Sequence, residues 1–287
     1  MAIKVILTPL FGNDSDTTAL ATAQALAERT GAHIDAMHVR ADPRDMIPYI
    51  GEGMSGALID EIVGNAEQQG SERAKKVRKS FDDWRAEAGI PLAEAASDGP
   101  SCGWTETVGR PDAIIARRGR LADLTVLSRP SGDDNATITT EVLEAALLES
   151  GRPILVAAAA PAKTLGNRIA IAWNGGAEAS RAVAASLPLL AAAVSVTAIT
   201  IGEPAELEAN GAGLIDYLAW HDVKARLVSL EKSNTPVGEA LLAAAESENA
   251  DLMVMGAYTH SRLRELVFGG VTRDILGAAG LPVLMAH

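Results

Sequence analysis

The residues best suited to chemistry in this chain form a glycine-rich stretch ahead of a predicted helix in the second half of the sequence. Gly256 follows a short apolar strand, and its missing Cβ lets the chain turn sharply and lets a ligand approach the backbone. A polar loop with Arg262 comes next, and Gly269-Gly270-Val271-Thr272 then opens the helix. Backbone amides at such a helix start bind anions, and the Thr272 hydroxyl is placed to contact a phosphate or the ligand shell of a metal. The stretch predicts an anion site, with a simple helix cap after a surface loop as the alternative.

The sequence carries none of the other common catalytic motifs. Gly51–Gly56 leads into Ala57-Leu58 rather than into the lysine of a P-loop, and no Gly-x-Gly-x-x-Gly follows the first predicted strand. The five histidines show no metal-ligand spacing, and Cys102 is interpreted as an ordinary small residue rather than a redox thiol. These observations disfavour a nicotinamide dehydrogenase and a structural metal site, and we expect no catalytic residues.

An internal repeat organises the chain. The segment 151–156, Gly-Arg-Pro-Ile-Leu-Val, recurs at 280–285 as Gly-Leu-Pro-Val-Leu-Met, and the segment 122–127 recurs at 250–255. Val108-Gly109 and Val237-Gly238 keep nearly the same separation. Three matches in one order indicate a tandem duplication. We expect one domain over residues 1–160 and a second over residues 161–287.

Apolar runs of strand length alternate with amphipathic segments in both halves. We predict strands over 3–8, 33–39, 92–96, 123–128, 153–158, 168–173, 194–201, 223–229, 251–256 and 282–286. Predicted helices occupy 16–30, 57–86, 105–118, 138–149, 177–191, 204–220, 235–248 and 269–279. This alternation favours right-handed βαβ crossovers and a parallel sheet with helices on both faces. The predicted fold class is α/β, with two tandem, doubly wound, five-stranded parallel-sheet domains of the adenine nucleotide alpha hydrolase-like or flavodoxin-like kind. Ligands of such sheets bind outside the carboxyl ends of the strands.

The first half carries an insertion between Arg40 and Trp84. Pro43–Gly56 is rich in glycine and proline and predicts a mobile loop near the mouth of the first half's pocket. Residues 57–84 have helical spacing with one apolar face. Because the duplicated terminal strands need cover, we expect the two halves to pack as an intramolecular pseudo-dimer. The insertion helix offers a further face for a homodimer.

The duplication, the stretch from Gly256 to Thr272 and the terminal Gly-x-Pro-Val-Leu strand resemble the universal stress protein (UspA) family in its tandem two-domain form. The resemblance covers essentially the whole chain and is clearest in the second half. ATP-binding members of that family carry the pattern Gly-x2-Gly-x9-Gly-Ser/Thr. Gly256 matches the first position, Thr259 replaces the second glycine, and Gly269 with Gly270 matches the end. The resemblance implies ATP as the ligand, with Mg²⁺ accompanying the nucleotide.

The same resemblance implies contacts from the ends of the first two strands of the second half. Asn174 stands where the family has an aspartate near adenine and ribose, and its amide keeps hydrogen-bonding capacity without the charge that helps hold a cation. Thr200-Ile201-Gly202 would supply backbone contacts to adenine. The implied nucleotide-binding residues are Trp173, Asn174, Ile201, Met255, Gly256, Thr259, Arg262, Gly269, Gly270, Val271 and Thr272.

The first half lacks these features. Ser128-Arg129-Pro130 leads into Asp133 and Asp134 with no glycine pair, and two carboxylates would repel phosphate. Asp14 or Ser15 is interpreted as the N-terminal cap of the first helix. We therefore expect at most one nucleotide site per chain, in the second half.

Composition limits the partners. With 25 Lys+Arg against 37 Asp+Glu, the net charge of −12 argues against a nucleic-acid partner and against docking on an anionic membrane. A single cysteine excludes an intramolecular disulfide. With no apolar run of membrane-helix length and no visible signal peptide, we expect a cytoplasmic protein.

Three functions remain open. A stress-response binding protein with one degenerate adenine-nucleotide site is favoured. A protein of the same fold that acts through protein interactions or another small ligand is the alternative, and a true nucleotide hydrolase is the third. Thr259 separates the first two, because a side chain that points into the phosphate path would weaken nucleotide binding.

Overall fold

The structure is a computed structural model that describes residues 2–46, 55–130, 136–161, 164–257 and 270–287. The elements of the first half are β1 (Val5–Pro9), α1 (Asp16–Thr30), β2 (His33–Arg40), the 3-10 turn η1 (Pro43–Met46), α3 (Gly56–Ala88), β3 (Ser101–Val108), α4 (Pro111–Gly119), β4 (Leu124–Leu127), α5 (Ala136–Glu149) and β5 (Ile154–Val156). Those of the second half are β6 (Arg168–Ala172), α6 (Ala177–Ala191), β7 (Ser195–Gly202), α7 (Pro204–Ala219), β8 (Ala225–Glu231), α8 (Val237–Ser247), β9 (Leu252–Gly256), α9 (Gly270–Ala278) and β10 (Val283–Ala286).

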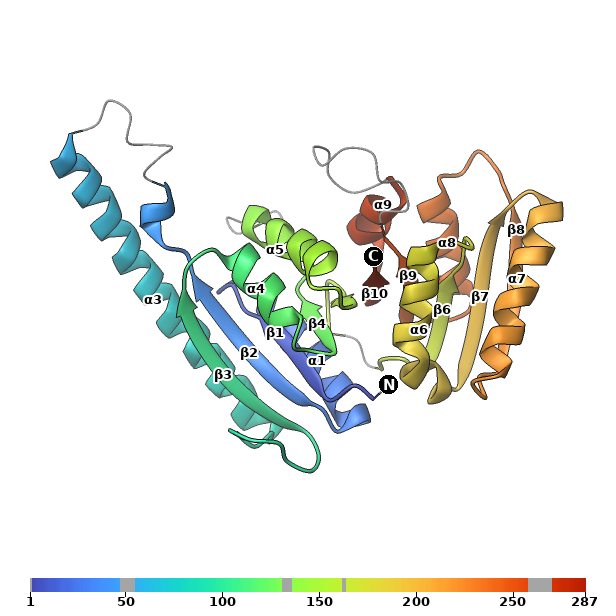
Figure 1. Ribbon diagram of the computed structural model, residues 1–287, viewed down its shortest axis with the longest axis horizontal. Coiled ribbons are helices and arrows are strands. Elements are labelled where there is room, and N and C mark those ends of the chain that lie inside the picture. Colours follow the sequence, from blue (N-terminus) through green and yellow to red (C-terminus); the bar gives the residue numbers. More distant parts are fainter. Residues whose placement is uncertain (1, 47–54, 131–135, 162–163, 258–269) are drawn as a thin grey trace.

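The ten strands form one sheet, in the order β3-β2-β1-β4-β5-β10-β9-β6-β7-β8 (Figure 1). Each half alone is parallel, and its strand order reverses direction next to its first strand, between β1 and β4 and again between β6 and β9. The halves join where β5 runs antiparallel to β10, with Leu155 opposite Leu284. These pairings confirm the predicted fold class and the prediction that the two terminal strands pair within one chain.

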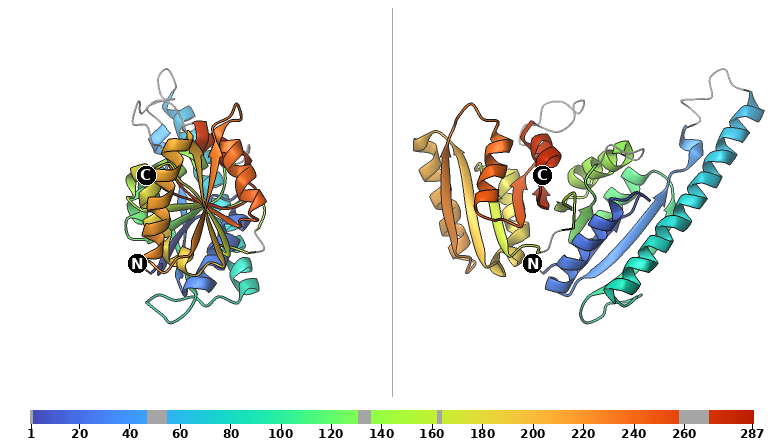
Figure 2. Two further views of the ribbon diagram at one scale, coloured as in Figure 1. Left: turned by 90° about the vertical axis from the view of Figure 1, so that its right-hand side faces the viewer. Right: turned by 180° about the vertical axis from the view of Figure 1, so that it is seen from behind.

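Helices cover both faces of the sheet, as the turned views show (Figure 2), and each face carries an apolar core. On one face, Ile34 and Leu155 belong to a core that includes Phe81 of α3 and residues of α1, α6 and α7. On the other face, Leu7 and Leu127 pack with residues of α4, α5, α8 and α9. Because successive strand residues point to opposite faces, a strand covered on both sides is apolar at nearly every position.

The third strand lies later in the sequence than predicted. β3 pairs with β2 along its whole length, from His33 opposite Ser101 to Arg40 opposite Val108. The strand predicted over 92–96 is wrong: within that segment only Leu92 forms a bridge, and Ala93-Glu94-Ala95-Ala96 has no β-branched side chain to favour extended structure. The helix predicted from residue 105 begins at Pro111, because β3 pairing holds 105–108 extended and proline suits the first turn of a helix.

The insertion helix is present as α3, capped by the Ser55 hydroxyl, which accepts from the backbone N–H of Leu58. Its predicted apolar face is buried only in the second half of the helix, through Ala74, Val77 and Phe81. Leu58 is 43% exposed, because the first half of α3 projects beyond the sheet (Figure 1). The predicted mobile loop lies largely in residues 47–54, outside the described residues.

Two further features bear on function. Cys102 is fully buried in β3, and burial raises the pKa of its thiol to about 11, which agrees with its interpretation as a core residue. Within the described ranges, no helix combines the length and the apolarity that crossing a bilayer requires.

Candidate functional site

The carboxyl ends of β6, β7 and β9 meet at one edge of the second half of the sheet. Ala172 lies opposite Ile199 on one side and opposite Met255 on the other, so the residues that follow each strand emerge together. α9, the next described element of the chain after β9, begins at Gly270. This edge lies beside the point where the strand order reverses, which is where open parallel sheets bind ligands. Three of the predicted site residues, Thr259, Arg262 and Gly269, lie outside the described residues.

Gly256 is required at its position, but for a reason the sequence did not suggest. A Cβ at this residue would lie 2.4 Å from the backbone N of Ala179 and 2.7 Å from the backbone C of Glu178. Gly256 is the last residue of β9 and pairs with Ala286, so the chain is still extended here and the predicted sharp turn at this residue is wrong. The space that a side chain of residue 256 would occupy is filled by the first turn of α6, not by a ligand.

Hydrogen bonds of the backbone and of the Asn174 side chain hold the turn between β6 and α6. Trp173 N–H donates to Ile199 O at 2.9 Å, which extends the β6–β7 pairing by one residue. Asn174 Oδ1 accepts from Gly176 N–H at 2.9 Å, and Gly175 has a φ of +73°. Because Oδ1 is used in this turn, the Nδ2 hydrogens are the donors that Asn174 retains for a ligand.

The residues beneath this edge are largely buried. Thr200 is 3% exposed and its hydroxyl donates to Ser229 Oγ of β8 at 3.2 Å. Ile201 is half-buried, whereas Met255 is 4% exposed and belongs to the core on the α8/α9 face. Met255 therefore meets the site through its backbone, and Trp173 and Ile201 are half-buried predicted residues with apolar surface left at this edge.

At the start of α9, the predicted site residues Gly270 and Thr272 differ in solvent exposure. Gly270 is exposed, and a Cβ there would meet no atom within 4 Å. Val271 is half-buried against the same core as Met255. Thr272 is 4% exposed, so its side chain is buried and does not lie on the surface of the site as the predicted phosphate contact requires.

Two helix starts give this edge its electrostatic character. The first turn of α6 lies against Gly256, and α9 is the next described element after the same strand. Helix N-termini carry a partial positive charge and attract anions. Glu178 in the first turn of α6 pairs with Arg181 at 3.1 Å, which offsets its charge. In the described part of the chain, no group of three or more His, Cys, Asp or Glu is arranged to hold a metal ion.

In the first half, a carboxylate of the chain occupies the equivalent edge. Gly12 and Gly175 each follow the first strand of their half with positive φ, 84° and 73°. Four residues after each stand Asp16 and Ala179. The Asp16 carboxylate, 3% exposed, accepts from Gly12 N–H at 2.7 Å and from Phe11 N–H at 2.9 Å. These two backbone N–H groups are therefore already hydrogen-bonded to a buried carboxylate of the chain itself.

This arrangement corrects the predicted cap of α1. Ser15 occupies the N-cap position, but its side chain makes no capping hydrogen bond, because its hydroxyl donates to Asn13 Oδ1 at 2.8 Å. Asp14 contributes its backbone oxygen, which accepts from the Thr17 hydroxyl. Asp133 and Asp134, on which the loss of the first-half site was predicted, lie outside the described residues.

Arg129 connects the end of β4 to the helix of the candidate site, and the sequence analysis did not identify it. Its guanidinium donates to Ile275 O, Leu276 O and Leu281 O at the C-terminal side of α9, and its Nε donates to Ala157 O at 3.3 Å. Burial lowers the pKa of this guanidinium. A cation at a helix C-terminus complements the helix dipole, so Arg129 fixes the orientation of α9 from the first half of the chain.

Comparison with known proteins agrees with this architecture. A universal stress protein from Archaeoglobus fulgidus DSM 4304 matches with a TM-score of 0.70 and 15% identity, over 98% of this chain and 95% of that chain. A functionally unknown protein from Pseudomonas aeruginosa PAO1 matches with a TM-score of 0.58 and 14% identity, over 99% and 92%. A search of curated protein sequences found no match. The model of the universal stress protein family matches residues 133–287, more than half of the sequence. The chain therefore belongs to the universal stress protein family.

Proposed function

We propose that this protein is a stress-response binding protein with one adenine-nucleotide site per chain, at the carboxyl edge of β6, β7 and β9. The observation that carries the proposal is the exchange of Asp16 for Ala179 at the same place in the two halves. In the first half a buried carboxylate accepts from the backbone donors of the turn after β1. In the second half that position holds a methyl group, so an anionic ligand meets no buried carboxylate there.

The residues of this edge suit the parts of a nucleotide. The exposed start of α9 at Gly270 offers backbone donors to the phosphates, and Asn174 retains its Nδ2 hydrogens for ribose or adenine. Ile201 supplies half-buried apolar surface for the base. We assign Gly269, Thr259 and Arg262 to the phosphate side from the family pattern, with Mg²⁺ accompanying ATP. We also propose that residues 1–160 and 161–287 are the two domains, and that the first does not bind nucleotide.

Calorimetric titration with ATP and Mg²⁺ tests the proposal on two matched variants. Gly270→Asp places a carboxylate at the exposed start of α9, and Gly277→Asp places the same group near the end of the same helix. A Cβ at either glycine meets no atom within 4 Å, so neither variant is crowded. We expect binding to one site per chain in the wild type, no detectable binding in Gly270→Asp, and wild-type affinity in Gly277→Asp.

Three results would contradict the proposal. A stoichiometry of two sites per chain would mean that the first half also binds nucleotide. Equal affinity of the wild type and Gly270→Asp would mean that the phosphates do not lie at the start of α9. No binding by the wild type would favour the alternative of a different ligand or a protein partner.

A further inference from the structure

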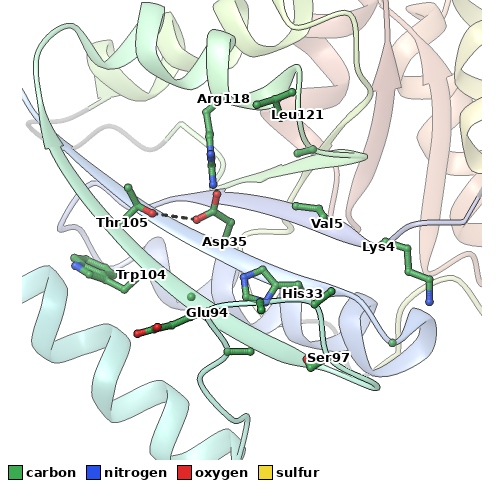
Figure 3. Close-up of a pocket in the computed structure, with 16 residues that line it drawn as sticks. Lys4, Val5, His33, Asp35, Glu94, Ser97, Trp104, Thr105, Arg118 and Leu121 are labelled. Carbon is green, nitrogen blue, oxygen red and sulfur yellow. Dashed lines mark hydrogen bonds and ion pairs between the residues drawn. The ribbon is translucent and has the colours of Figure 1, made fainter.

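A cavity lies at the amino ends of the strands in the first half of the chain. Its volume is about 820 Å³, within the range of pockets that hold small molecules. Its floor is the sheet surface at the starts of β1, β2 and β3, one wall is the end of α4, and the other is the segment 93–97 (Figure 3). It is therefore separate from the candidate nucleotide site.

The floor of this cavity is polar where a covered parallel sheet would be apolar. His33 and Asp35 of β2 and Thr105 of β3 line it. The residues between them that point to the other face, such as Ile34 and Cys102, are fully buried in an apolar core. Since the other face of the same strands follows the rule for a doubly covered sheet, the polar floor is a local departure from it.

The buried acid on this floor is paired with a cation, and each of its oxygens accepts a hydrogen bond. Asp35 is 5% exposed, and its Oδ2 accepts from Arg118 Nε at 2.8 Å. Its Oδ1 accepts from the Thr105 hydroxyl at 3.4 Å. In the described part of the chain, the Nη groups of Arg118 make no hydrogen bond to the protein, and they lie in the wall of the cavity (Figure 3). The ion pair thus holds a guanidinium in place with its outer donors unused.

His33 is also arranged as a donor. Ser97 donates its hydroxyl to Ser101 Oγ at 3.0 Å, and Ser101 Oγ lies 2.9 Å from His33 Nδ1. In the tautomer in which Ser101 donates its hydroxyl to Nδ1, the ring proton is on Nε2. Burial lowers the pKa of His33, which keeps the ring neutral near pH 7. Nε2 lies above Gly103, since a Cβ there would be 3.0 Å from it.

We propose that this cavity binds a small organic monocarboxylate with an apolar body. The carboxylate oxygens accept from the Nη groups of Arg118, and the imidazole N–H of His33 is a second donor on the floor. Bidentate pairing of a guanidinium with a carboxylate is among the strongest and most directional polar contacts in proteins. The apolar body lies against Val5, Ala95 and Leu121, of which Leu121 is 75% exposed without a ligand. At Arg118 a carboxylate fits better than a cation because the buried acid there, Asp35, is already paired, while the cavity's other carboxylate, Glu94, lies on the opposite wall in the segment 93–97.

The test uses 2-naphthoate as the probe and 2-naphthamide as its neutral analogue of the same shape. Binding is followed by calorimetry and by the C2–H proton resonance of His33, assigned from its loss in His33→Gln. Arg118→Gln removes the outer donors, and Arg117→Gln, at the neighbouring exposed arginine of α4, is the matched control. Because Arg118→Gln leaves Asp35 buried without its partner, the double variant Asp35→Asn/Arg118→Gln repeats the test without an unpaired charge.

We expect 2-naphthoate to shift the His33 resonance and to bind at least tenfold more tightly than 2-naphthamide. We expect Arg118→Gln and the double variant to lose at least tenfold in affinity, while Arg117→Gln binds as the wild type does. Equal binding of acid and amide, an unchanged affinity in Arg118→Gln, or no binding of 2-naphthoate would overturn the proposal. ATP titration of Arg118→Gln keeps the two sites distinct, because loss of carboxylate binding leaves the nucleotide site untouched.

Discussion

The contact between Gly256 and the start of α6 is a direct test of how the candidate site is built. Gly256→Ala would place a Cβ 2.4 Å from Ala179 N and 2.7 Å from Glu178 C, closer than the 3.0 Å that real Cβ contacts respect. Both neighbours are backbone atoms of a helix whose Ala179, Ala182 and Val183 are buried. The first turn of α6 must therefore move by more than half an ångström, against a packed core.

The size of the effect follows from two opposing terms. Overpacking of this kind costs about 1–3 kcal/mol. Replacing a glycine that lacks positive φ stabilises a protein by about 0.4–1 kcal/mol through the unfolded chain. We expect Gly256→Ala to lower the free energy of unfolding by about 1.3 kcal/mol, the difference between the midpoints of these two ranges. Gly277→Ala in α9 has open space around its Cβ, so the same substitution there raises it by about 0.5–1 kcal/mol.

Urea denaturation of the wild type and both variants measures this difference, with the slope of the transition as a check that the same cooperative unit unfolds. ATP titration of Gly256→Ala then reports whether displacement of α6 disturbs the site. If Gly256→Ala and Gly277→Ala both raise the urea midpoint, α6 does not rest on the strand end and the account of Gly256 is refuted.

Three further predictions concern single residues. Arg129→Met removes the donors to the end of α9 and should lower the free energy of unfolding by about 2–3 kcal/mol, measured by urea denaturation. An unchanged midpoint would show that water replaces these hydrogen bonds without any change in stability. Thr259→Gly restores the family pattern and should tighten ATP binding by about 1 kcal/mol in calorimetry, and weaker binding would mean that the hydroxyl contacts the nucleotide. Burial, the largest cause, lowers the pKa of His38 below its ordinary 6.5. The unfolded chain therefore takes up a proton first, so stability falls as pH drops below 6.5. The urea midpoint should fall more between pH 7.5 and 5.5 in the wild type than in His38→Gln, and equal falls would contradict the assignment.

Most of the fold could be predicted from the sequence because its strands are buried on both faces. A run such as Leu252–Met255 is apolar at each position, and helices flank it on both sides in the sequence. β3 was misplaced because it is an edge strand that carries the half-buried Thr105 on one face and the exposed Glu106 on the other, so polar residues interrupt its pattern. Edge strands tolerate such residues, and pairing with β2 rather than local pattern decides where β3 lies.

The candidate site was less predictable because its key contacts join residues that are distant in the sequence. The sequence indicates that position 256 needs a glycine, but the α6 backbone that leaves no room for a Cβ there lies more than seventy residues earlier. Arg129 looks like an ordinary surface arginine until α9 is placed beside β4. Asp16 is local to its partners, yet nothing in the composition of 11–16 distinguishes a carboxylate that binds the preceding turn from one that caps a helix.

The antiparallel pairing of β5 with β10 sets the order in which this chain completes its sheet. β5 has Ile154, Leu155 and Val156 fully buried, and its outer neighbour is Val283–Ala286. In a chain made from its N-terminus, β1 to β5 emerge well before that neighbour exists. Until then β5 is an open, apolar edge, of the kind that recruits a strand from another molecule. Because of the duplication, β5 pairs with the four-residue strand β10 of the same chain rather than with a strand of a second subunit. β10 is the last strand to be synthesised, so the nascent first half can pair through β5 with another copy of itself until the second half is complete.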